Sequence, residues 1–83
     1  MNRKESVNLQ LNKELEILVK GEYSEFADGE IFEVESIDLI KGDNYNLLDW
    51  ANATMARIIA RDQQKYTDIF VVLEELCLEK IKN

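Results

Sequence analysis

A run of acidic residues interleaved with apolar ones constrains this chain more than any other feature. Between Gly21 and Ile40 the sequence carries seven acids and no Lys or Arg. The whole chain has 17 acidic and 10 basic residues, a formal net charge of −7. The rest of the chain therefore has 10 acidic and 10 basic residues, so the net charge comes from this stretch. Alternation of apolar and charged residues is typical of a half-buried strand, and the stretch therefore favours a sheet.

The acidic stretch predicts a β-hairpin. Asp28-Gly29 is a strong two-residue turn signal, because Asp and Gly tolerate the left-handed geometry of such turns. The segment 30–40 is predicted as the second strand. Its apolar phase shifts by one residue near Ser36, as a β-bulge would cause. The arm before the turn, 23–27, is short and less regular, so the pairing of this strand stays open.

The N-terminal segment has two periodicities. Residues 6–11 alternate as a strand does, whereas the apolar residues from Lys13 onward favour a helix across about 12–20. Asn12 is its expected N-cap, and Gly21 follows as the residue that ends it.

A strand followed by a short helix resembles the start of ribbon-helix-helix repressors. That family has a second helix directly after the first, where this chain has the acidic stretch instead. Its DNA-reading ribbon also carries basic side chains, whereas Asn8 and Gln10 are neutral. We therefore do not expect DNA binding through this segment.

The C-terminal half predicts two antiparallel helices with a turn near 63–66. Asn46 and Thr67 are the expected N-caps. A single helix over 47–82 is the alternative, about 50 Å long at 1.5 Å per residue, and it would imply a coiled-coil dimer. The predicted fold is a small α+β single domain, 1–83, with an N-terminal helix, an acidic β-hairpin and a C-terminal antiparallel helix pair. An all-α bundle or a long-helix dimer is the alternative.

The sequence holds few groups suited to catalysis. It has no His, the usual acid–base group near neutral pH. Cys77 lies among apolar residues, the setting of a buried and unreactive thiol. The acids of the hairpin do not match the spacing of a calcium-binding loop. We therefore expect no enzyme activity, no metal and no cofactor.

The acidic hairpin predicts a surface that binds a basic protein. Alternate residues of a strand share one face, about 6.6–6.8 Å apart, so the acids form rows that resemble a line of phosphates. Such a surface attracts basic partners and repels nucleic acid and anionic membranes. The alternative is that the acids only keep an exposed strand soluble. The predicted partner-binding residues are Glu25, Glu30, Glu33, Glu35 and Asp38, with Tyr23 and Trp50 as apolar anchors.

These features favour a non-catalytic cytoplasmic protein that inhibits or modulates a basic, nucleic-acid-handling protein, as immunity proteins, antitoxins and phage anti-host factors do. One alternative is a structural homo-oligomer, such as a homodimer, held by the C-terminal helices. A further alternative is a nucleic-acid-binding regulator that uses the basic stripe Arg57, Arg61 and Lys65. No apolar run is long enough to cross a membrane, and a single cysteine suits a reducing compartment.

Overall fold

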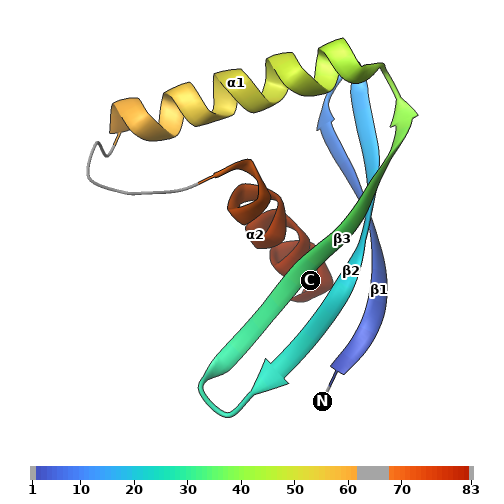
Figure 1. Cartoon of the computed structure of the whole chain (residues 1–83), viewed down its shortest axis with the longest axis vertical. Coiled ribbons are helices and arrows are strands. Elements are labelled where there is room, and N and C mark those ends of the chain that lie inside the picture. The colour runs from blue at the N-terminus through green and yellow to red at the C-terminus, as the bar shows by residue number, and fades with distance from the viewer. Residues whose placement is uncertain (1, 62–67, 83) are drawn as a thin grey trace.

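The chain folds as a three-stranded antiparallel sheet followed by two helices. The computed structural model describes residues 2–61 and 68–82. The strands are β1 (Asn2–Asn12), β2 (Leu15–Phe26) and β3 (Gly29–Lys41), with β2 in the centre (Figure 1). The helices are α1 (Asn44–Arg61) and α2 (Ile69–Lys82). The predicted α+β class is confirmed, and the all-α bundle is not supported.

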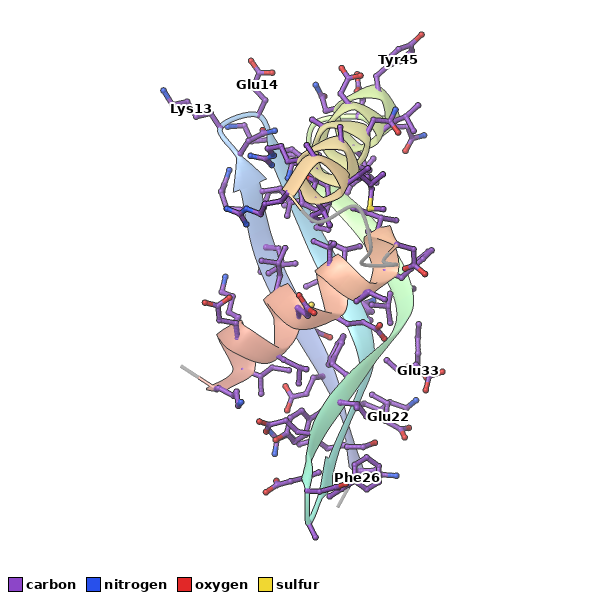
Figure 2. All side chains as sticks on the ribbon, turned by 90° about the vertical axis from the view of Figure 1, so that its left-hand side faces the viewer. Lys13, Glu14, Glu22, Phe26, Glu33 and Tyr45 are labelled. Carbon is purple, nitrogen blue, oxygen red and sulfur yellow. The ribbon has the colours of Figure 1, made fainter. Side chains whose placement is uncertain are left out.

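The two helices take different positions on the sheet. In Figure 1, α1 runs across one end of the sheet and α2 lies against one face. Figure 2 looks along α1 while showing α2 from the side, so the axes cross steeply rather than forming the predicted antiparallel pair. α2 packs mainly on β3 and β1 and less on α1.

The predicted turn near 63–66 and the predicted cap Thr67 lie outside the described residues. Neither helix is both long and apolar enough to cross a membrane.

One face of the sheet, here called the inner face, packs against α2 and forms the core. Leu15, Ile17 and Val19 of β2 are completely buried there. From α2, Leu73 and Cys77 pack against them with exposures of 1% and 0%. The buried set is completed by Val7 and Leu9 of β1, Tyr23 of β2 and Phe32 of β3. In the part of the chain that the structure describes, no helix lies over the opposite, outer face.

The predicted helix over 12–20 is wrong: this segment is the β1–β2 turn and the start of β2. Leu15 and Val19 belong to a two-residue alternation with Ile17, which the helical interpretation overlooked. Leu18 lies on the outer face, but its spacing of three residues from Leu15 is also that of one face of a helix. Two strands alone are marginal in water, and a third makes the sheet stable. The resemblance to ribbon-helix-helix repressors therefore ends here, whereas the strand expected over 6–11 is confirmed as part of β1.

Asn12 makes the hydrogen bond of a turn rather than of a helix cap. Its Oδ1 accepts from the backbone N–H of Glu14 at 2.8 Å, which turns the chain from β1 into β2. The same local bond can begin a helix or close a turn, so the residue type could not separate the two. Lys41 Nζ donates to the Lys13 carbonyl at 2.9 Å and ties this turn to the end of β3.

The predicted hairpin around Asp28-Gly29 is confirmed. β2 and β3 pair in antiparallel register from Phe26 opposite Gly29 onward. Near Ser36 the register shifts, because Lys20 faces Ser36 while Gly21 faces Val34. Glu35 is the extra residue of the predicted bulge.

Gly21 provides the seat for the largest core side chain instead of ending a helix. A Cβ at this position would lie 2.8 Å from the Phe32 ring and 2.2 Å from the Glu33 carbonyl oxygen. The missing side chain therefore lets Phe32 close over β2, where it is only 2% exposed. This close approach fixes the pairing of β2 with β3 in the middle of the acidic hairpin.

Each helix begins with an aspartate cap. Asp43 Oδ1 accepts from the Asn46 backbone N–H, and Asn46 Oδ1 accepts from the Asp43 N–H, both at 2.9 Å. This reciprocal pair is a capping box, so α1 starts earlier than predicted and Asn46 is the second member of its cap. Asp68 Oδ1 accepts from the Val71 N–H at 3.0 Å at the start of α2.

α2 also covers parts of both sheet edges. Lys80 Nζ donates to the Asn8 carbonyl of β1, and the Glu74 carboxylate accepts from the backbone of Val34 in β3. Unpaired edge groups invite the addition of another strand, and charged side chains placed on them discourage it. These two contacts therefore protect part of each sheet edge.

We predict that Gly21→Ala destabilises the fold by about 1–3 kcal/mol, the usual cost of overpacking a core. The new methyl group would collide with the Phe32 ring and the β3 backbone. Chemical denaturation measures the loss, with Lys20→Ala, at the exposed neighbouring position, as the control. An unchanged free energy of unfolding in Gly21→Ala would contradict the tight seating of Phe32.

Candidate protein-binding surface

The outer face of the sheet brings together acids from β2 and β3. Glu22 lies directly opposite Glu33, and both point away from α2 in Figure 2. Glu35 in the bulge and Asp38 continue the row along β3. Beside them, near the hairpin end, lie the exposed apolar residues Phe26 and Ile31. We call this set the outer acidic surface: Glu22, Phe26, Ile31, Glu33, Glu35 and Asp38.

Two pairs of like charges face each other across the hairpin. Glu22 stands opposite Glu33 on the outer face, and Glu25 stands opposite Glu30 nearer the turn. Like charges directly opposite on adjacent strands destabilise a sheet. One acid of each pair is compensated within the fold, Glu22 by Lys4 and Glu30 by Lys82.

Lysines neutralise part of the outer acidic surface. Lys4 Nζ lies 2.5 Å from Glu35 Oε2 and 3.3 Å from Glu22 Oε2. The bond to Glu35 is the main reason that the pKa of Lys4 is raised. Lys20 Nζ lies 3.5 Å from Asp38 Oδ2. Within the described part of the chain Glu33 forms no ion pair, so its charge is the one left most available to a partner.

Tyr23 and Glu30, both predicted for the binding surface, lie on the inner face instead. Tyr23 is 6% exposed, and its hydroxyl donates to Glu30 Oε2 at 2.6 Å. Lys82 Nζ of α2 lies 2.5 Å from Glu30 Oε1, and the Arg3 guanidinium stacks over the Tyr23 ring at 4.5 Å. This cluster joins all three strands to the end of α2, which is a structural role.

The charges of that cluster shift the pKa values of both groups. The hydrogen bond to Glu30, then burial, raises the pKa of Tyr23 to about 12. The bond from Lys82, then that from Tyr23, lowers the pKa of Glu30. Both shifts favour a neutral tyrosine that donates to an ionised carboxylate.

The remaining predicted residues are divided between two regions. Glu33, Glu35 and Asp38 belong to the outer acidic surface, and Glu25 is exposed near the hairpin end. Trp50 is half-buried on α1 and packs against the core, so it does not sit beside these acids.

The sequence interpretation did not single out Phe26 and Ile31 as candidates for the binding surface. Both are about half exposed, at 54% and 52%. The alternation of the strand contained this information. Ile31 lies two residues from the exposed Glu33 and therefore on the same face, whereas Tyr23 pairs with the buried Phe32 on the other face. Reading outward from the Asp28-Gly29 turn would have separated the two faces.

Other reactive or charged groups of the described chain lie outside the outer acidic surface. Cys77 is buried, and burial raises the pKa of its thiol to about 11, as expected for an unreactive cysteine. The described residues contain no group of three metal-ligating side chains. Of the predicted basic stripe, Arg57 and Arg61 are exposed on α1, and Lys65 lies outside the described residues.

Comparisons of the chain with models of known protein families, with curated proteins and with solved structures found no significant match.

We predict that Glu33→Gln stabilises the fold by about 0.2–1 kcal/mol, the usual size of a cross-strand pair. The change removes the repulsion from Glu22 without altering side-chain shape. Urea unfolding gives the difference, and Glu14→Gln in the β1–β2 turn is the control. A lower stability would show that Glu33 makes a favourable contact instead.

We also predict that Tyr23 loses its proton near pH 12, against about 10 for an ordinary tyrosine. Ultraviolet titration of the wild type and of Tyr23→Phe isolates this step, and Tyr45→Phe is the control. Glu30→Gln should lower the pKa of Tyr23. Tyr23 has a lower pKa in the unfolded chain than in the folded one. Its contribution to the free energy of unfolding is therefore complete below about pH 10 and is lost as the pH rises through about 12. A Tyr23 step near pH 10 in the wild type would contradict the bond to Glu30.

Proposed function

We propose that this protein is a non-catalytic binding protein that modulates a basic partner through the outer acidic surface. The observation that carries the proposal is the pairing of Glu22 with Glu33 on a face without helices, beside the exposed Phe26 and Ile31. Lys4 and Lys20 balance Glu22, Glu35 and Asp38, which solubility alone would explain, but Glu33 has no such partner in the described part of the chain. Paired acids beside exposed apolar side chains favour recognition instead.

The acids and the apolar residues would contribute differently to binding. Negative charge steers a basic partner and raises the association rate. Phe26 and Ile31 would supply the apolar contact that is buried once the partner arrives, since hot spots lie in desolvated centres surrounded by polar residues. Lys4 and Lys20 would release their carboxylates to the partner or remain at the rim.

A nucleic-acid-handling protein is the proposed class of partner. Rows of carboxylates on β2 and β3 offer such a protein the charge and approximate spacing of phosphates. By occupying its basic groove, the chain would act as immunity proteins, antitoxins and phage anti-host factors do. We place the interaction in the cytoplasm, where the single buried Cys77 would stay reduced.

The charge reversal Glu33→Lys with Glu35→Lys tests this proposal. Both side chains are exposed, so we expect the fold to survive, as circular dichroism would verify. Immobilised wild type should capture a basic protein from lysate of the source cell and release it in high salt. The double variant should lose that capture.

The matched control is Glu14→Lys with Glu75→Lys, which changes the net charge equally at exposed positions away from the outer face. We expect the control to keep the captured protein, and Phe26→Ser to weaken its binding without changing the salt dependence. Equal capture by the double variant and the wild type would overturn the proposal. If the control also lost the captured protein, the interaction would depend on net charge alone and not on the outer acidic surface.

A further inference from the structure

Helix α1 carries a second apolar face that does not contact the core. Thr54 is its one buried residue, and Leu47 and Trp50 pack beside it on the core side. On another side of the helix, Tyr45 is 79% exposed and points away from the sheet in Figure 2. Leu48 and Ile59, on this same side, are 57% and 54% exposed.

The spacing of this second face is that of a helix-pairing seam. Its residues follow one another at intervals of three, four, three and four positions. We call them the α1 seam: Tyr45, Leu48, Asn52, Met55 and Ile59. Intervals of three and four define the a and d positions of a heptad repeat, which point toward a neighbouring helix. None of the five is charged, whereas Asp49 lies beside the seam.

Large apolar side chains of both helices are exposed. Tyr45, Leu48 and Ile59 of α1 and Phe70 of α2 are each more than half exposed.

The seam adjoins an apolar groove. Leu48 and Ala51 of α1, Ile37 of β3 and Phe70 of α2 are among the residues that line this groove of about 420 Å³. Phe70 is 54% exposed. The apolar surface thus continues from the seam onto α2, so a helix laid along α1 would cover both.

We propose that a second copy of this chain covers the α1 seam, with the two α1 helices parallel and in register. A single Asn at an a position within an apolar seam specifies register and a two-stranded state. In a parallel pair Asn52 meets Asn52 of the second copy, and the two amides can hydrogen-bond. In an antiparallel pair a positions face d positions, so Asn52 would lie against Met55 and lose that partner. An unrelated apolar helix would likewise leave the Asn52 amide unpaired.

The dimer leaves the outer acidic surface free. The seam lies on α1, at the end of the sheet opposite the hairpin, which carries Phe26 (Figure 2). A dimer would present two outer acidic surfaces. Dimer formation and partner binding can therefore be tested separately, because a variant that loses one need not lose the other.

Mass measurement against concentration tests the dimer, by light scattering or sedimentation. The wild type should rise from one chain toward two. Ile59→Glu places a charge in the seam and should weaken association at least about tenfold, whereas Ala60→Glu, with the same charge at the exposed next position, should not. Asn52→Leu should associate more tightly, and circular dichroism would verify that each variant keeps the fold.

Met55→Cys tests the arrangement. In the parallel pair the two introduced thiols meet and form a disulfide between chains on mild oxidation by oxygen, whereas buried Cys77 stays out of reach. A wild type that remains one chain at millimolar concentration would overturn the proposal, as would an equal effect of Ile59→Glu and Ala60→Glu. A dimer without the disulfide would overturn the in-register arrangement.

Discussion

The structure depends on the packing of α2 over the inner face of the sheet, where side chains of all three strands share one core with it. Leu73 and Cys77 close over Leu15, Ile17 and Val19, and all five are nearly or completely buried. A chain of this length can cover one face of a three-stranded sheet and no more. Because α2 covers the inner face, most strand side chains of opposite phase keep contact with water, and Ser24, at 7% exposure, is the buried exception. The outer face therefore follows from the core rather than from a separate element.

This one-sided arrangement divides the surface into two regions of different chemistry. The outer face carries paired acids with Phe26 and Ile31 at the hairpin end, and it suits a basic partner. The helical side carries exposed apolar residues along α1, and it suits another helix. Between them, Lys80 and Glu74 occupy backbone groups at the sheet edges. These two contacts discourage strand addition at the backbone groups that they occupy.

The sequence predicted the elements whose signals are local. The Asp28-Gly29 turn, the strand after it, the bulge near Ser36 and two C-terminal helices are present. The helix over 12–20 failed because Leu15, Leu18 and Val19 fit both periods, and only pairing with β1 decides between them. Gly21 was misread for a similar reason, since its role is to accommodate Phe32 on the neighbouring strand.

The candidate surface was predicted only in part, because which acids share a face depends on register. Glu33, Glu35 and Asp38 were placed correctly on one strand. Tyr23 and Glu30 turned inward, where Lys82 joins them from the far end of the chain. Phe26 and Ile31 gained importance only when the sheet showed which phase is exposed. The composition showed that the hairpin is acidic, whereas the pairing of the strands determines which of its carboxylates are exposed on the outer face.

Nuclear magnetic resonance mapping tests the central claim most directly. The labelled protein is titrated with a Lys- and Arg-rich peptide, or with the captured partner once known, and backbone shifts are followed residue by residue. The account predicts that the changes concentrate on Glu22, Ile31, Glu33 and Glu35 and disappear in Glu33→Lys with Glu35→Lys. Changes spread evenly over all acids, or confined to α1, would contradict a specific outer acidic surface.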